Sequence, residues 1–207
     1  MKKVLVILAA LALLPVASAM AGPIVGQQVV VDYGPYHSGD GGEFSVTGPG
    51  YSFLTFCVET NEYFNPGNSY YIGSITEGAD YNGNPPNPVP LTPQVAYLYT
   101  QFMAGDLSGY DYTSDTDAGL LQSAIWEWMG EVTADPTNPF YNLAGTAVSS
   151  GAWSGLGNVA ILNLWADPEY TEAAQDQLTL VPEPTSMLLI GTGLIGLAAA
   201  VRRRRQR

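Results

Sequence analysis

The chain has almost no positive charge outside its two ends. Its seven basic side chains are Lys2, Lys3, the four arginines at 202–205 and Arg207, whereas residues 22–181 contain 18 of the 19 acids and a single histidine. Because no Lys or Arg offsets these acids, this body carries a formal charge near −18. Such a charge excludes nucleic acid as a natural partner and disfavours anionic membrane surfaces. It is compatible with cationic or divalent partners.

Cysteine is nearly absent as well. Cys57 is the only one, so the chain has no internal disulfide framework. The sequence also lacks a set of side chains with the spacing of a metal site, and it lacks a catalytic triad. We therefore expect no metal, no cofactor and no enzymatic turnover.

Residues 1–21, MKKVLVILAALALLPVASAMA, have the three parts of a secretory signal peptide. Lys2 and Lys3 form the charged start, 4–14 is the apolar run, and a small-x-small cleavage site follows at 17–19 or 19–21. The apolar run is too short to anchor the protein across a bilayer. We expect signal peptidase to remove this segment and the protein to be exported.

Residues 182–207 form a second terminal segment, which has three parts. VPEPTS is followed by an apolar stretch at 185–201, roughly 26 Å long as a helix and just short of the ~30 Å hydrocarbon core, and then by RRRRQR. The simplest interpretation is a C-terminal anchor in the inner membrane, with the arginine cluster on the cytoplasmic side. The order of parts also resembles the PEP-CTERM sorting signal; the residues that carry the resemblance are Pro182, Glu183, Pro184, Arg202, Arg203, Arg204 and Arg205.

That resemblance implies a substrate of exosortase, which removes such tails in Gram-negative bacteria that make exopolysaccharide. The protein would be held in the membrane transiently and then reach the cell surface or the extracellular matrix. Between the two terminal segments, 22–181 is long enough to form one domain with a sizeable core.

Strand patterns come first along this domain. We predict strands at 27–33, 43–47, 51–59 and 69–76, and a closing strand at 176–181. In 51–59, YSFLTFCVE, both faces are largely apolar, which favours a central strand. The segment 77–90, rich in Pro, Asn and Gly, is predicted to be a loop.

Helical patterns follow the first four strands. Thr92 is a suitable N-cap for a helix from Pro93 to Gly105, a second helix carries LLQSAIWEWMG and stops at Gly130, and a third is predicted at 159–165. Strands first, helices later and one final strand predict an α+β fold. We expect a mainly antiparallel sheet or sandwich with an inserted group of about three helices.

Gln122 is an unusual residue for its position on the second helix. It shares an apolar stripe with Trp126 and Met129, and a buried amide without a partner costs about 1–3 kcal/mol. It could hydrogen-bond nearby backbone groups or face a partly wet edge. Cys57 could likewise be a small buried hydrophobic residue. In an exported protein, however, a lone cysteine must be sheltered, paired between chains or chemically occupied.

One reaction would use both groups. If the Cys57 sulfur attacks the side-chain carbonyl of Gln122, ammonia leaves and a thioester joins the strand to the helix. The reaction requires the two side chains to touch in a dry site. The product would store an acyl group that an amine or hydroxyl on a partner could attack.

Two motifs support this hypothesis by resemblance. FCVE at 56–59 and LQSAIW at 121–126 resemble the two signature motifs of the bacterial Cys–Gln thioester domain, a module of Gram-positive surface adhesins. The second motif of that family is Thr-Gln-x-Ala-Ile-Trp, and Leu121 replaces its Thr. The resemblance covers roughly 50–181 and implies that Cys57 and Gln122 are the reactive pair; the supporting matches are Phe56, Val58, Glu59, Ala124, Ile125 and Trp126.

The sequence thus leads to two functional hypotheses. The first is a surface-anchored protein whose Cys57–Gln122 thioester, between a strand and a helix, attaches it covalently to amine or hydroxyl groups of the matrix or of another surface, in adhesion or biofilm. The alternative is a non-covalent structural or glycan-binding matrix protein in which Cys57 is a buried free thiol.

Overall fold

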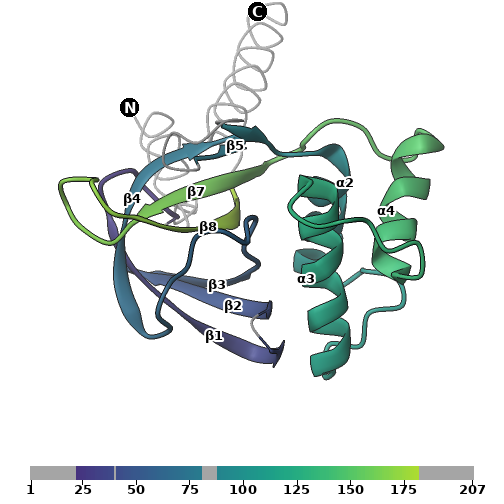
Figure 1. Cartoon of the computed structure of the whole chain (residues 1–207), viewed down its shortest axis with the longest axis horizontal. Helices are drawn as coiled ribbons and strands as arrows, with labels where there is room; N and C mark the ends of the chain where they lie inside the picture. The colour runs from purple at the N-terminus through teal and green to yellow at the C-terminus, as the bar shows by residue number, and fades with distance from the viewer. Residues whose placement is uncertain (1–21, 40, 81–87, 182–207) are drawn as a thin grey trace, which may run out of the picture.

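A six-stranded antiparallel sheet makes up the larger layer of the molecule (Figure 1). The computed structural model describes residues 22–39, 41–80 and 88–181, so both terminal segments predicted from the sequence lie outside the described residues. The strands follow the order β3-β2-β1-β4-β7-β8 across the sheet. Their bounds are β1 Gln28–Ser38, β2 Gly41–Gly48, β3 Tyr51–Thr55, β4 Asn68–Thr76, β7 Val159–Trp165 and β8 Ala173–Leu180.

The sheet is curled, because the chain just after β3 pairs with the strand at the opposite edge. Within residues 56–58, which we call the bridging segment, Phe56 O accepts a hydrogen bond from Leu178 N at 3.1 Å, and Val58 N donates to Asp176 O at 3.2 Å. Between these two hydrogen bonds, Cys57 and Gln177 are partners in an isolated antiparallel β-bridge. The bridging segment therefore joins the β3 edge of the sheet to the β8 edge.

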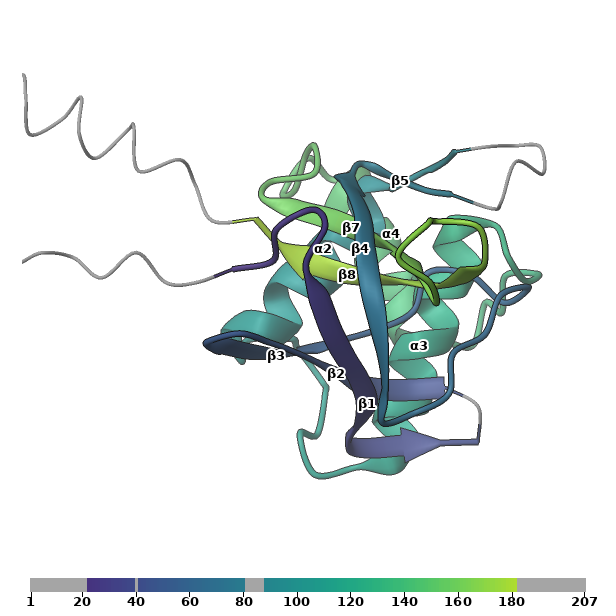
Figure 2. The same ribbon diagram turned by 90° about the vertical axis from the view of Figure 1, so that its left-hand side faces the viewer.

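Three helices are inserted between the early strands and β7. They are α2 Pro93–Ala104, α3 Asp115–Met129 and α4 Pro139–Ser149, and they gather on one side of the sheet (Figure 1). In Figure 2, turned by 90° so that the side of the molecule away from the helices faces the viewer, the strands lie in front and α3 and α4 lie behind them. A small second sheet pairs β5 Gly78–Ala79 with β6 Val89–Pro90. The predicted α+β class, with an antiparallel sheet and an inserted helical group, is confirmed.

Capping residues define the ends of α2 and α3. The side chains of Thr92 and Ser114 accept hydrogen bonds from backbone N–H groups in the first turns of α2 and α3, which would otherwise lack partners. Gly105 and Gly130 close the same helices in the left-handed conformation, at φ of 76° and 83°. These signals explain why the predicted bounds of α2 and the predicted end of α3 are close to the observed ones.

The prediction of a helix at 159–165 is wrong. This segment is β7, whose residues are buried except for a partly exposed Trp165. Ile161 packs toward the helices, whereas Leu162 and Leu164 belong to a second cluster on the other face of the sheet. A strand covered on both faces shows no alternation, so its periodicity cannot be told from that of a buried helix. The third helix is instead α4, which begins at Pro139 after the N-cap Asn138.

Two further expectations need correction. The third strand ends at Thr55 rather than at 59, and it lies at one edge of the strand order rather than in the middle. Both faces of 51–59 are apolar because its second half is enclosed between β8 and the helices. The loop at 77–90 contains the paired strands β5 and β6.

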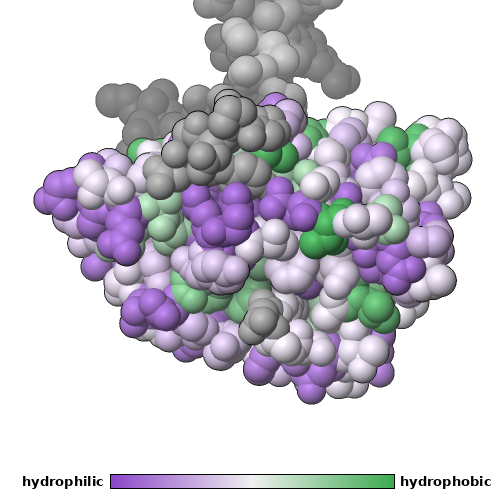
Figure 3. Space-filling view, in the orientation of Figure 1, coloured by the Kyte–Doolittle hydropathy of each residue, from purple (hydrophilic) through white to green (hydrophobic). Residues whose placement is uncertain are grey.

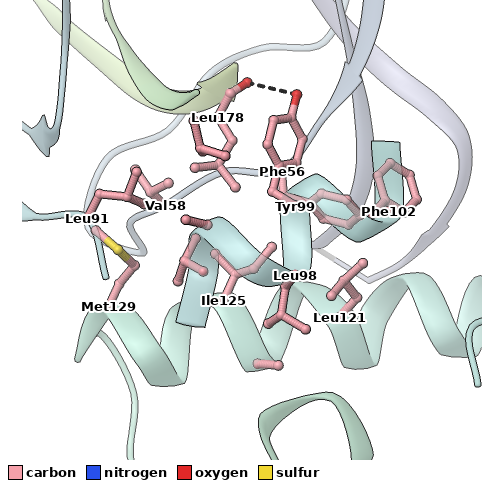
Figure 4. Packing of buried hydrophobic residues seen from close by; sticks show 14 of the residues in the cluster. Phe56, Val58, Leu91, Leu98, Tyr99, Phe102, Leu121, Ile125, Met129 and Leu178 are labelled. Atoms are coloured by element: carbon pink, nitrogen blue, oxygen red, sulfur yellow. Dashed lines mark hydrogen bonds between the residues drawn. The ribbon is translucent and has the colours of Figure 1, made fainter. Parts of the chain in front are cut away.

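Two hydrophobic clusters hold the fold together. The larger one, which we call the apolar core, lies between the sheet and the helices and includes Phe56, Tyr99, Leu121 and Ile125 (Figure 4). Its Tyr99 hydroxyl donates to Leu178 O at 3.3 Å and to Leu54 O at 2.8 Å, so the one polar end of this ring is paired. The smaller cluster consists of residues from β1, β2, β4, β7 and β8 only.

The outer surface is largely polar, as its acidic composition suggests. In Figure 3 the visible face is mostly hydrophilic to neutral, with small separate hydrophobic patches. Within the part of the chain that the structure describes, no helix has the length and hydropathy needed to cross a bilayer. The apolar stretch predicted at 185–201 is outside that part.

Candidate functional site

Cys57 and Gln122 lie in direct contact. Cys57 is in the bridging segment and Gln122 is in the middle of α3, and three polar contacts join them. The Cys57 Sγ–H and the Cys57 backbone N–H both point to Gln122 Oε1, each at 3.2 Å, and Gln122 Nε2 donates to Cys57 O at 2.7 Å. The carbonyl carbon that a sulfur would attack is one C=O bond, about 1.23 Å, from that oxygen.

This contact is dry. Cys57 is fully buried and Gln122 is 1% exposed. Gly41, at the start of β2, closes one side of it, because a Cβ atom at this position would come within 2.8 Å of Gln122 Cγ and 3.1 Å of the Trp126 ring. The end of the β1–β2 hairpin therefore rests directly on the glutamine side chain, and only glycine fits there without displacement.

Other buried polar side chains surround the pair. We call Cys57, Glu59, Gln122, Asp176 and Gln177 the polar seam, because they lie where the bridging segment, β8 and α3 meet. All five are at most 1% exposed. Glu59 Oε1 accepts a hydrogen bond from Asp176 N at 2.5 Å. Among the described residues, Glu59 Oε2, Gln177 Oε1 and Trp126 Nε1 have no hydrogen-bond partner.

The surroundings hold the Cys57 sulfur as a thiol. Burial raises the pKa of Cys57 far above its ordinary value, and the charge of Glu59 raises it further. Two smaller contributions oppose this effect by favouring the thiolate, first that of the Cys57 backbone N–H and then that of the Trp126 side chain. The Trp126 contact lacks the geometry of a full hydrogen bond, so we regard it as a weak electrostatic one.

The carboxyl groups of the polar seam are also shifted. Burial, and next the charge of Asp176, raise the pKa of Glu59 to about 10. Burial likewise raises the pKa of Asp176 well above its usual range. Glu59 is therefore a neutral acid near pH 7, which limits its repulsion of any negative charge that develops on sulfur.

The other motif residues serve different purposes. Phe56, Ala124 and Ile125 are fully buried members of the apolar core, and so is Leu121, which replaces the Thr of the family motif. Glu59 belongs to the polar seam, and the Trp126 ring lies against Gly41 beside the Gln122 side chain. The predicted sorting residues Pro182, Glu183, Pro184, Arg202, Arg203, Arg204 and Arg205 lie outside the described residues.

Sequence reasoning missed three participants. The sequence predicts Asp176 and Gln177 only as part of a closing strand, and it gives no reason to single out Gly41. The run Gln-Asp-Gln at 175–177 was an available signal, because three polar residues in succession are unusual in a strand that proves to be buried on both faces. Nothing in the local sequence around Gly41 indicates its contact with Gln122.

The acidic side chains around the pair were also compared with the geometry that a metal centre requires, over the described residues alone. Within the described parts of the chain, no group of three or more His, Cys, Asp or Glu side chains is placed to hold a metal ion. Glu59 and Asp176 interact mainly with backbone and amide groups of their own surroundings, including Leu164 N and Asn163 Nδ2 on Asp176.

Comparison with known protein families finds a match at the C-terminal end of the chain. The PEP-CTERM protein-sorting motif matches residues 180–205. This motif implies a secreted protein that is anchored transiently in the membrane, processed by exosortase and sorted to the surface. No curated protein and no solved structure matches the chain.

Proposed function

We propose that this surface-sorted protein forms an internal thioester between Cys57 and Gln122, and uses it to attach covalently to amine or hydroxyl groups of the extracellular matrix or of another surface. The observation that carries the proposal is the contact of the Cys57 sulfur with the Gln122 side-chain amide in a dry site, where two hydrogen bonds to the Cys57 backbone also hold that amide. The sorting motif at 180–205 supports the location in which such attachment would be useful.

The bond-forming step balances within the pair. The Cys57 sulfur adds to the Gln122 side-chain carbonyl carbon, the C–N bond breaks, and the thiol proton leaves on the departing nitrogen as part of ammonia. The products are a thioester and one ammonia molecule, with no outside reagent. Because the two groups are held in contact, proximity offsets the weak nucleophilicity of a protonated thiol.

The backbone of Cys57 supports this reaction. Its N–H donates to Gln122 Oε1, the atom on which negative charge develops when sulfur adds to the carbon. Its carbonyl accepts from Gln122 Nε2 and thereby orients the amide. The Trp126 N–H, which has no other partner among the described residues, is a second donor close to the reacting sulfur.

Burial protects the product after it forms. A fully enclosed thioester is shielded from water, which would otherwise hydrolyse it to a glutamate at position 122 and a thiol. Attack by an amine would break the C–S bond, form an amide at residue 122 and return the proton to the Cys57 sulfur. Each molecule would react once, so the protein would act as a coupling reagent and not as an enzyme with turnover.

Amine labelling tests the proposal. After incubation of the purified protein with methylamine, we expect one adduct, which peptide mapping assigns to residue 122, together with one newly titratable thiol. Cys57→Ala should give no adduct. Gln122→Glu serves as a second control, because it has the composition of the hydrolysed product and no amide to lose. Absence of any adduct in a folded wild-type protein would sink the proposal.

The second candidate function is a non-covalent structural or glycan-binding matrix protein. The observation that favours it is that both ends of the Gln122 amide are already paired with the Cys57 backbone, so burial of the amide needs no further explanation. This alternative predicts one buried thiol that titrates only after unfolding, and a protein that is inert to methylamine.

A further inference from the structure

An aromatic pocket opens beside the Cys57–Gln122 contact. Its volume is about 410 Å³, within the range of roughly 300–1,000 Å³ that ligand sites occupy. Phe44 forms its base and is 2% exposed, whereas Tyr33 and Tyr63 at its edge are 49% and 77% exposed. The aromatic rings that line it are those of Tyr33, Phe44, Tyr63, Phe64 and Trp126.

The pocket and the reactive pair share a wall. Trp126 lines the pocket, and it lies one helical turn after Gln122 on the same face of α3. The Trp126 side chain also approaches the Cys57 sulfur closely enough to affect its pKa. A ligand that rests against Trp126 is therefore next to the buried pair.

The polar part of the pocket lining lies close to negatively charged groups. Thr60 and Gln175 line the pocket. Glu131 accepts hydrogen bonds from Thr60 N at 3.1 Å and from Thr60 Oγ1 at 3.3 Å, which places a carboxylate directly behind this wall. Residues 22–181 contain 18 acids and no Lys or Arg, so the field at the pocket favours a cation.

Aromatic faces and a negative field together select one ligand chemistry. Both attract an alkylammonium group, the rings through cation–π contacts and the carboxylates through charge. The aliphatic stem of such a group gains by packing on the rings. A neutral sugar would gain the stacking alone. In proteins, a lysine side chain provides both the stem and the primary amine.

We propose that the aromatic pocket binds a lysine side chain of a partner protein and presents its amine to the acyl group at residue 122. The covalent part rests on the proposed function; the binding part does not. The bound ammonium loses one proton to solvent, the neutral nitrogen adds to the carbonyl carbon, and the C–S bond breaks. An amide then joins the partner to residue 122, and the second nitrogen-bound proton passes to the Cys57 sulfur.

Binding is tested first, without the thioester. The full chain carrying Cys57→Ala is titrated with Nα-acetyl-lysine methylamide, its uncharged norleucine counterpart and glucose, a neutral sugar. We expect the lysine compound to bind most tightly and Tyr63→Ala to weaken its binding about fivefold. Tyr170→Ala, which removes an exposed tyrosine outside the pocket, is the matched control and should leave that affinity unchanged.

Reaction is tested next in the protein that retains Cys57. The ratio of adduct formation with the lysine compound to that with methylamine should fall about fivefold in Tyr63→Ala and stay unchanged in Tyr170→Ala. Equal binding of the lysine and norleucine compounds, or tighter binding of glucose than of the lysine compound, would overturn the assignment. Lysine-selective binding without an adduct from any amine would support the pocket and contradict the thioester.

Discussion

The apolar core and the polar seam are neighbouring buried regions that contain opposite kinds of side chain. Around Leu121 and Ile125 the core contains hydrophobic side chains, and the Tyr99 hydroxyl in it is fully paired. One residue along α3, Gln122 belongs to a seam of amide, carboxyl and thiol groups that is equally dry. In that seam Glu59 Oε2 and Gln177 Oε1 lack partners among the described residues.

This contrast suggests that the apolar core mainly stabilises the fold, whereas the polar seam mainly serves the reaction of Cys57 with Gln122. Buried polar atoms without partners cost about 1–3 kcal/mol each, so a structure selected for stability alone would avoid them. Among the described residues such atoms also occur elsewhere, on Glu43 and Thr100 for example, but three of them lie around Cys57, the residue whose reaction with Gln122 we propose. The comparison therefore predicts that changes in the core alter stability, whereas changes in the seam alter the Cys57–Gln122 chemistry.

The largest effect on stability should come from a substitution in the apolar core. Leu121→Ala removes a fully buried side chain, and we expect it to lower the free energy of unfolding by about 2–5 kcal/mol. Urea denaturation of the purified variant measures this loss. A loss under about 1 kcal/mol would mean that Leu121 is not a core residue. In the fraction that remains folded, ammonia loss at Gln122 should still occur.

Gly41→Ala should affect both the stability of the fold and the formation of the thioester. Its added Cβ would lie 2.8 Å from Gln122 Cγ, so we expect a cost of about 1–3 kcal/mol and a lower fraction of thioester, because the amide must move. The matched control is Gly119→Ala on α3, whose Cβ would press on Ser38 of the same hairpin at 2.9 Å. Equal thioester fractions in the two variants, measured by intact mass, would refute the positioning role of Gly41.

Glu59 makes the seam sensitive to pH. Its pKa is raised from an ordinary 4.5 to about 10, so the folded protein keeps a proton that the unfolded chain releases. The resulting stabilisation is fully present below about pH 4.5 and is lost as the pH rises through 10.

Glu59→Gln, which stays neutral, should therefore flatten the decline of stability between pH 5 and 9, by at most ~1.4 kcal/mol per pH unit. Asp176 and Glu62, the latter with a pKa raised to about 7, keep part of the slope in this variant. Urea midpoints across the pH range provide the measurement, with the exposed Glu169→Gln as the control. Identical slopes for wild type and Glu59→Gln would contradict the neutral state of this acid.

The smallest effect concerns the helix that carries Gln122. Ser114→Ala removes the N-cap of α3, whose hydroxyl accepts from Asp117 N at 3.2 Å, and should cost about 1 kcal/mol. Because Gln122 lies about two turns further along, amine labelling at residue 122 should be unaffected. A lower labelling yield at full folding would show that the seam depends on the end of α3.

Local signals account for the parts of the fold that were predictable. The Thr92 cap, Pro93 and the closing glycines mark α2 and α3. β7 was misassigned because burial on both faces removes alternation. The edge position of β3 was missed because residues 56–58 acquire their apolar surroundings from β8, more than a hundred residues away.

The candidate site was predictable only in part. The sequence identified Cys57 and Gln122 through chemistry and motif resemblance, and the structure places them in contact. Whether the bond forms stays a prediction. The contributions of Asp176, Gln177 and Gly41 depend on curling of the sheet and on the position of the hairpin, which no local pattern encodes.

The most direct test of the account is the intact mass of the purified wild-type protein under denaturing conditions, combined with a thiol titration. A Cys57–Gln122 thioester predicts a mass lower than that of the sequence by one ammonia, and no titratable thiol until an amine or hydroxide is added. The full mass with one titratable thiol would contradict the thioester and leave Cys57 as a buried free cysteine.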